Sequence, residues 1–296
     1  FRVRPNPMNR SLLLSGIAAL VAVSSATAQW SEASPATSPS TRSGCAMTFD
    51  TLRGETVLFG GSSVFTFFND TWVYDGSTWT QRQPATSPGG RTESRMVWDA
   101  TRGVSVLYGG NAGGGPFGGP SIDETWEFDG TTWAQVTTTT TPGGLANHGM
   151  AYDIVRSRVV VYGGLADSSF PIAAGETWEY DGTDWTLIAT AASPGPRQDV
   201  AMCYHAGMQR TVMFGGVDPQ VGGFGDTWTF DGTNWARLTI AGPTPSPRTL
   251  SKMVYDARRN VCVMYGGMDA TNGTLINETW EFDGTRWPQV ASPVHP

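Results

Sequence analysis

The chain has 296 residues, of which only 15% are charged, and its 37 Gly, 19 Pro and 12 Trp suit turn-rich β structure better than helical bundles or disorder. The net charge is -7, and the single lysine, Lys252, belongs to no basic stripe, so we expect neither nucleic acid nor an anionic membrane as a partner. Three Cys are too few for a disulfide framework, and three His leave little for a His-built metal site.

The N-terminal region has the pattern of a secretory signal. Arg10 precedes an apolar run from Leu12 to Val23, which is too short to span a bilayer, and Ala26-Thr27-Ala28 provides a cleavage site of small residues. We therefore expect a signal peptide over 8–28, cleaved near Ala28, and a protein that is secreted, periplasmic or on the cell surface, with no membrane insertion after cleavage. Residues 1–7 precede a plausible initiator methionine and are interpreted as a non-native leader.

The remainder of the chain is repetitive. Gly-Gly pairs recur at a mean period of about 52 residues, at 60–61, 109–110, 163–164, 215–216 and 266–267. After each pair comes an acid-Thr-Trp triplet, and eight residues beyond its Thr stands a second Trp. The two tryptophans of the five repeats are Trp72 and Trp79, Trp126 and Trp133, Trp178 and Trp185, Trp228 and Trp235, and Trp280 and Trp287.

Each repeat predicts four short strands. The first ends in an aromatic residue before a turn, the second is an apolar run closed by Gly-Gly, and the third carries Thr-Trp and ends in Asp-Gly, a strong hairpin signal. The second Trp opens the fourth strand. The predicted blades cover about 42–82, 91–136, 145–188, 197–238 and 248–290, followed by a tail at 291–296.

The pattern resembles the kelch family of β-propellers, which includes galactose-oxidase-like proteins. An Arg-led first strand, a strand closed by Gly-Gly, a strand ending in an aromatic and Asp, and a Trp-led fourth strand recur over about residues 42–290. The resemblance implies an all-β propeller with five recognisable four-stranded blades. A single Lys beside eighteen Arg suggests a GC-rich, bacterial genome.

Residues that recur in every repeat are interpreted as scaffold, because five equivalent positions would rarely all contact one ligand. The resemblance pairs the acid before each Thr-Trp with the arginine that opens the first strand, namely Arg42, Arg91, Arg197 and Arg248. The third repeat has Leu145 in place of that arginine yet keeps Glu176, so ion pairing cannot be the acid's sole role. A methionine three residues before each turn is expected to pack between blades.

Positions where the repeats differ are the candidates for binding. The segment from Gly-Gly to Thr-Trp varies in length while the other spacings are constant, and variable loops on a rigid scaffold commonly bind ligands. These loops carry Phe65, Phe67, Phe117 and Phe170. The resemblance places the connection before the first strand on the same face, with Glu93, Arg95, Asn147, His148, Asp199 and Lys252 around the channel mouth. The alternative, weighted equally, is that all of these are solvated loop residues.

The leading functional hypothesis is a binding module for a protein or glycan, with no catalytic residues, metal or cofactor. One alternative is a carbohydrate-active enzyme, since kelch-like propellers include a copper oxidase of sugars and a sialic-acid epimerase; another is a structural surface or matrix protein. His148 and His205 are expected at different ends of the ring, which disfavours a shared copper. Cys45, Cys203 and Cys262 are interpreted as buried thiols, with a Cys203–Cys262 bridge left open.

Residues 29–41 are interpreted as a fourth-type strand and its connector, because Trp30 to Arg42 has the same spacing as Trp79 to Arg91. The fifth repeat already has its own fourth strand at Trp287. Two alternatives follow: a five-bladed ring with the Trp30 strand left over, or a part of a ring with six or more blades. We favour the second, because propellers cover their sheet edges, and expect the chain to self-associate or to melt at low temperature.

Overall fold

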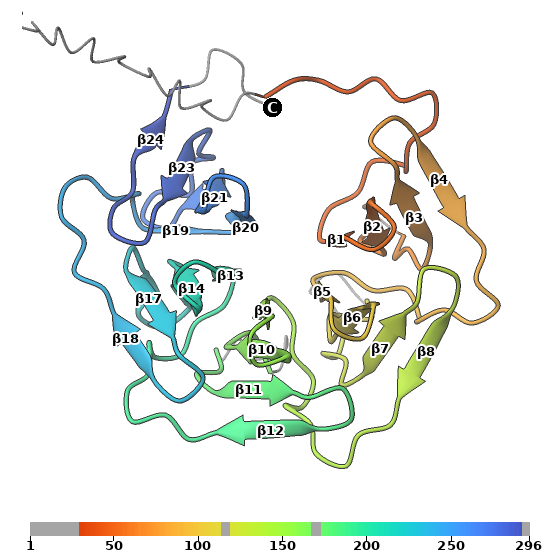
Figure 1. Cartoon of the computed structure of the whole chain (residues 1–296), viewed down its shortest axis with the longest axis horizontal. Coiled ribbons are helices and arrows are strands. Elements are labelled where there is room, and N and C mark those ends of the chain that lie inside the picture. The colour runs from red at the N-terminus through yellow and green to blue at the C-terminus, as the bar shows by residue number, and fades with distance from the viewer. Residues whose placement is uncertain (1–29, 65, 114–118, 167–172, 292–296) are drawn as a thin grey trace, which may run out of the picture.

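Five four-stranded antiparallel sheets make up the structure, a computed structural model that describes residues 30–64, 66–113, 119–166 and 173–291. The sheets are arranged around a central channel as the blades of a β-propeller, with the first strand of each blade innermost and the fourth outermost (Figure 1). The predicted all-β, five-bladed fold is confirmed. Within the described ranges no helix is long and apolar enough to cross a membrane.

Strand boundaries follow the sequence repeat. Blade 1 contains β1 (Ala46–Asp50), β2 (Glu55–Phe59), β3 (Thr71–Tyr74) and β4 (Trp79–Arg82). Blade 2 contains β5 (Arg95–Asp99), β6 (Val104–Tyr108), β7 (Thr125–Phe128) and β8 (Trp133–Val136). Blade 3 contains β9 (Gly149–Asp153), β10 (Arg158–Tyr162), β11 (Thr177–Tyr180) and β12 (Trp185–Ile188).

Blades 4 and 5 add short strands in their loops. Blade 4 contains β13 (Ala201–His205), β14 (Arg210–Phe214), β17 (Thr227–Phe230) and β18 (Trp235–Arg237), with a small hairpin of β15 (Val217–Asp218) and β16 (Gly222–Gly223). Blade 5 contains β20 (Lys252–Asp256), β21 (Val261–Tyr265), β23 (Thr279–Phe282) and β24 (Gln289–Val290), and β19 (Arg248–Thr249) pairs with β22 (Met268–Asp269). The fourth strand of blade 5 starts two residues after its Trp, because Pro288 has no N–H to donate.

An aspartate closes both hairpin turns in four of the five blades. In blade 1, Asp50 Oδ1 accepts the backbone N–H groups of Leu52 and Arg53, and Asp75 Oδ1 accepts those of Ser77 and Thr78. These side chains replace backbone acceptors in the turn, which is why Asp suits both positions. The same two bonds recur at the corresponding turn aspartates of the other blades, whereas His205 takes the first-turn place in blade 4.

The Gly-Gly pairs are needed because neighbouring blades approach each other there. Gly60 and Gly61 have φ of 67° and 93°, and a Cβ on Gly60 would lie 2.7 Å from the carbonyl oxygen of Arg91 in blade 2. The Gly61 N–H donates to that same carbonyl at 2.8 Å. Equivalent bonds join blade 2 to 3, 3 to 4 and 4 to 5, so Gly-Gly joins blades and does not cradle phosphate.

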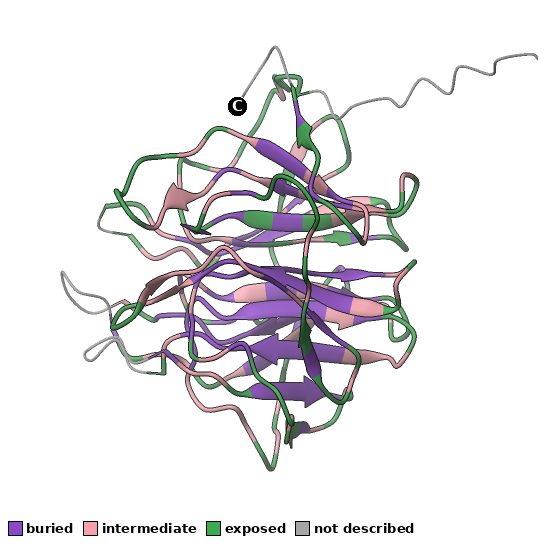
Figure 2. Ribbon diagram, turned by 90° about the vertical axis from the view of Figure 1, so that its left-hand side faces the viewer, coloured by how far each residue is buried: buried purple, intermediate pink, exposed green. Residues whose placement is uncertain are grey.

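The core lies between the blades. The fourth-strand tryptophans Trp133, Trp185, Trp235 and Trp287 are at most 2% exposed, and each packs against the blade that precedes it. Buried residues occupy the strands and exposed ones the loops at both ends of the ring (Figure 2). Cys203 and Cys262 meet across blades 4 and 5 as buried free thiols, with their sulfurs 3.0 Å apart.

The junction between blades 5 and 1 differs from the other four. First strands contact each other in the series β1, β5, β9, β13 and β20, and among the described residues β20 and β1 form no comparable contact. The predicted packing of the repeated methionines between blades holds for Met96, Met150, Met202 and Met253, which are at most 7% exposed. Met47 is 47% exposed because no sheet covers its side of blade 1, so the prediction is wrong there.

Candidate binding face

The variable loops and the connections into the first strands lie at the same end of the ring. Isolated β-bridges join them in blades 1 to 4, for example Ser43 with Ser62, Thr92 with Asn111, and Ala146 with Leu165, and β19 pairs with β22 in blade 5. The bridges follow from the repeat, because the chain enters each first strand beside the end of the second. This end, which we call the channel-mouth face, therefore carries the candidate residues identified from the sequence.

Two cations enter the channel from the innermost strands. Arg95 starts β5 in blade 2 and Lys252 starts β20 in blade 5, whereas the equivalent residues of blades 1, 3 and 4 are Ala46, Gly149 and Ala201. Arg95 Nη2 lies 3.9 Å from Asp199 Oδ1, which belongs to blade 4. Residues from three blades thus converge at one end of the channel, where the scaffold itself needs only small side chains.

Burial shifts the pKa values of these groups away from those of free side chains. Loss of water raises the pKa of Asp199 to about 6, and the opposing attraction of Arg95 and Lys252 is smaller. Loss of water around the side chain and repulsion by Arg95 lower the pKa of Lys252 to about 8, although the residue itself is exposed. Asp199 Oδ1 is buried, and no hydrogen bond to it is found among the described residues. The polar contact of this oxygen is the 3.9 Å ion pair with Arg95, and Lys252 is the most exposed of the three residues.

Glu93, Asn147 and Asp199 share a backbone role as well. Each has a positive φ, between 54° and 59°, at the residue where the chain turns into the first strand. The N–H of Glu93 donates to the carbonyl of Gly44, that of Asn147 to Glu93, and that of Asp199 to Asn147. These bonds form a belt around the channel through blades 1 to 4. Asn147 is 9% exposed, so the belt accounts for it better than ligand contact does.

His148 does not reach the channel surface. The side chain is fully buried, and its ring lies 5.6 Å from that of Tyr108 at an interplanar angle of 70°. Burial and the positive charge of Arg95 lower the pKa of His148 to about 3, so the imidazole is neutral. The sequence hypothesis placed His148 among ligand-binding residues; the structure places it between blades 2 and 3, because its position faces the neighbouring second strand.

The aromatic candidates lie at the loops. Phe67 is half-buried, and its ring occupies the space that a side chain at Gly113 in the neighbouring loop would need. Phe67 therefore packs one variable loop against the next. Phe65, Phe117 and Phe170 lie outside the described residues.

A latch of arginine, acid and tryptophan fixes the loops of this face. Arg42 bonds Asp70 at 2.5 Å, and the pairs Arg91–Glu124, Arg197–Asp226 and Arg248–Glu278 repeat it. The acid also accepts the indole N–H of the third-strand Trp two residues later, as in Trp72 to Asp70. In blade 3, where Leu145 replaces the arginine, Glu176 keeps this second bond with Trp178. The constant two-residue spacing between the acid and the Trp was the sequence signal that could have revealed this hydrogen bond.

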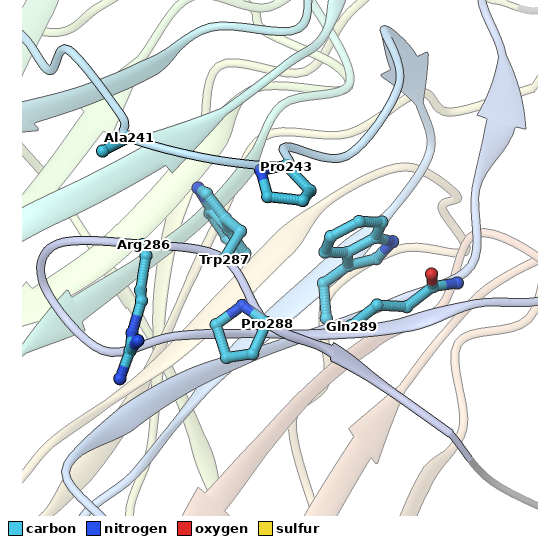
Figure 3. Close-up of a pocket in the computed structure, with 7 residues that line it drawn as sticks. Ala241, Pro243, Arg286, Trp287, Pro288 and Gln289 are labelled. Carbon is cyan, nitrogen blue, oxygen red and sulfur yellow. The ribbon is translucent and has the colours of Figure 1, made fainter.

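The described residues hold no metal cluster. No group of three His, Cys, Asp or Glu with metal-binding geometry occurs within the described ranges. His148 lies beside the start of β9 and His205 at the end of β13, hence at opposite ends of the ring. A small hollow in blade 5 is lined by Arg286 to Gln289 with Ala241, Pro243 and Trp280 (Figure 3). Its wall is the scaffold Trp287, so we assign it no ligand.

Comparison with known proteins agrees with the repeat analysis. Residues 114–294 match the family model described as the KLHDC2/KLHL20/DRC7 Kelch-repeats domain, which is more than half of the chain. No curated protein matches the chain.

Proposed function

The chain belongs to the kelch-repeat family, and from that premise we propose that it is an interaction module that binds a protein or glycan at the channel-mouth face. The observation that carries the proposal is the convergence of Arg95, Asp199 and Lys252 from three blades. Desolvated charges cost free energy unless they are paired, and the other blades manage without them. Arg95 and Asp199 pair with each other at 3.9 Å, which is too long for a direct hydrogen bond, and a ligand that hydrogen-bonds to both accounts for their retention.

The ligand that fits this arrangement presents both a hydrogen-bond donor and an anionic or strongly polar acceptor. Arg95 and Lys252 offer N–H groups to an acceptor, and Asp199 Oδ1 accepts from a donor. A peptide segment with polar side chains and a sugar with several hydroxyls both meet this requirement. Kelch propellers are generally protein-interaction modules, so a protein is the first ligand class to test.

The test compares binding by matched variants. The protein without residues 1–28 is immobilised and probed with a glycan array and with cell-surface proteins from candidate host or source cells. We expect binding that falls at least tenfold in Arg95→Ala and in Lys252→Ala. Arg237→Ala, at an outer-strand side chain that is 68% exposed, should bind as the unaltered protein does. Binding that survives all channel substitutions, or that is lost equally in the Arg237 control, contradicts the proposal.

We further propose that the protein acts outside the cytoplasm of a bacterium. The charged start, apolar run and small-residue site of residues 8–28 support export. Expression of the chain in a bacterial host, followed by mass measurement of the extracellular or periplasmic product, should give a polypeptide that starts at Gln29. Full-length product retained in the cytoplasm contradicts this proposal without affecting the first.

A further inference from the structure

Cys203 and Cys262 face each other across the interface of blades 4 and 5. Cys203 lies on β13, the first strand of blade 4, and Cys262 lies on β21, the second strand of blade 5 (Figure 1). Their sulfur atoms are 3.0 Å apart, and the two residues are 8% and 0% exposed. Both belong to the apolar cluster that joins the two blades, together with Phe214, Met253 and Met264. Packed strands, and not a loop, therefore hold the two thiols together.

The sequence repeat shows that the scaffold needs no cysteine at this contact. Cys203 stands two residues before the first-turn residue of its blade, and Cys262 stands four residues before Gly-Gly. The equivalent pairs between blades 1 and 2, 2 and 3, and 3 and 4 are Thr48 with Ser105, Val97 with Val159, and Ala151 with Thr211. Two of the three cysteines in the chain thus occupy both sides of a single contact, which a role in filling the core does not require.

Two facing thiols can form a disulfide or contribute to a metal site. Structural zinc sites take four ligands, and in the part of the chain that the structure describes no third His, Cys, Asp or Glu joins these two sulfurs in metal-binding geometry. Burial, together with the contact with Cys262, raises the pKa of Cys203 well above its usual range, so the folded protein keeps this thiol protonated and slow to react. Oxidation is therefore fastest while blades 4 and 5 are still packing together during folding.

We propose that Cys203 and Cys262 form a disulfide that crosslinks blades 4 and 5, with a small-molecule or protein disulfide as the oxidant. One cysteine thiolate attacks a sulfur of the donor R–S–S–R and releases RS⁻, which leaves a mixed disulfide on the protein. The other cysteine thiolate attacks the protein sulfur of this mixed disulfide and releases the second RS⁻. Each cysteine gives up one proton and each RS⁻ takes one up, so the donor gains two electrons and ends as two RSH.

The crosslink stabilises the blade that the ring holds from one side. The first strand of blade 5, β20, contacts β13 of blade 4, and among the described residues it makes no comparable contact with β1. Cys203 and Cys262 are 59 positions apart, so a disulfide between them removes much of the conformational freedom of the unfolded chain. The oxidised protein is therefore more stable than the reduced one. This inference depends on neither the ligand nor the export route proposed above.

The test refolds the denatured, reduced protein in a mixture of reduced and oxidised glutathione. Free thiols are counted after the product is purified and unfolded again, and we expect one, that of Cys45, where the reduced protein has three. Tryptic digestion without reductant should give a linked pair of peptides, 198–210 with 260–286, which is two hydrogen atoms lighter than the two peptides together. The melting temperature should exceed that of the protein kept in reductant by about 5 °C or more.

Cys45→Ala is the matched control, because Cys45 lies in blade 1, outside this interface. After the same refolding it should contain no free thiol and keep the rise in melting temperature. Cys262→Ala should keep two free thiols and show no rise, and comparing its oxidised and reduced samples removes the effect of the substitution itself. Three free thiols in the refolded unaltered protein overturn the proposal. So does a disulfide that includes Cys45 or joins two chains, or an oxidised protein that melts no higher than the reduced one.

Discussion

Four blade junctions of this ring are closed and one is open, although the sequence repeat is the same on both sides of each. In the closed junctions a fourth-strand tryptophan is at most 2% exposed, bonded to a Thr of the preceding blade and stacked on that blade's second strand. At the open junction Trp79 keeps its own-blade stacking and is half-buried. Identical motifs therefore differ in their contribution to stability according to what the neighbouring blade provides.

The largest difference is expected for tryptophan truncation. Trp185→Ala removes a buried indole and leaves a cavity, so the free energy of unfolding should fall by roughly 3–5 kcal/mol. Trp79→Ala should cost roughly 1 kcal/mol or less, because one side of its ring faces no neighbouring blade. Chemical denaturation of both variants checks this. Equal losses would show that the junction beside Trp79 is closed in solution.

Much of this architecture could be predicted from the sequence, because it depends on local patterns repeated five times. The spacing of Gly-Gly, Thr-Trp and the second Trp located the blades, and the strands β4, β8, β12 and β18 begin at the predicted residue. The arginine latch followed from the family resemblance and is found in four blades. These features were predictable because they depend only on contacts within one blade or between adjacent repeats.

Contacts set by the closure of the ring could not be predicted. Arg95 and Asp199 are 104 positions apart in the sequence, and their approach at 3.9 Å depends on the angle between blades 2 and 4. His148 carried the signature of an exposed polar loop residue, yet its place directly before β9 turns its ring onto Tyr108 of blade 2. The exposure of Met47 depends on what lies beyond its own sheet, which its repeat does not encode.

The open junction should not change how much the arginine latch contributes to stability, because the arginine and the acid of each latch belong to one blade. Asp226→Asn leaves the guanidinium of Arg197, whose side chain is 1% exposed, without its charge partner, and the expected loss is about 3 kcal/mol. Asp70→Asn, beside Arg42 in the open blade 1, should cost a similar amount. Thermal denaturation of the two variants makes the comparison. A much smaller loss in blade 1 would mean that the open junction loosens the whole blade.

The latch also predicts sensitivity to acid. Burial opposes ionisation of Asp226, but hydrogen bonds from Arg197 and Trp228 outweigh it and hold its pKa below the usual 3.8. A depressed folded pKa gives stability that is present above the unfolded pKa and lost as the pH falls through the folded one. The unaltered protein should therefore lose stability below about pH 4, and Asp226→Asn should show a weaker dependence there. An unchanged dependence would contradict the assignment.

Truncation of one methionine at each kind of junction compares how much stability the side chain contributes where a neighbouring blade covers it and where none does. Met96→Ala opens space in the packed interface of blades 1 and 2 and should cost at least about 2 kcal/mol. Met47→Ala, at the equivalent position on the open side, should change stability by at most about 0.5 kcal/mol. Urea titration of both variants is the measurement. Similar costs would indicate that the Met47 face is covered.

A smaller effect is expected from the charges in the channel. The raised pKa of Asp199, about 6, means that its ionised form costs stability, a cost absent below about pH 4 and fully present above about pH 6. For Lys252 the cost is present below its pKa of about 8 and is relieved as the pH rises from there toward 10.5. Asp199→Asn should flatten stability between pH 4 and 6. A profile unchanged by that substitution would place Asp199 in contact with water.

The distinction between closed and open junctions is tested most directly by hydrogen exchange at the second glycine of each Gly-Gly pair. The N–H groups of Gly61, Gly110, Gly164 and Gly216 each donate to the next blade, and their exchange should be protected. Gly267 occupies the same place in blade 5 and, among the residues that the structure describes, donates no bond to another blade, so its amide should exchange at least about tenfold faster than the other four. Equal protection of all five amides would contradict the account.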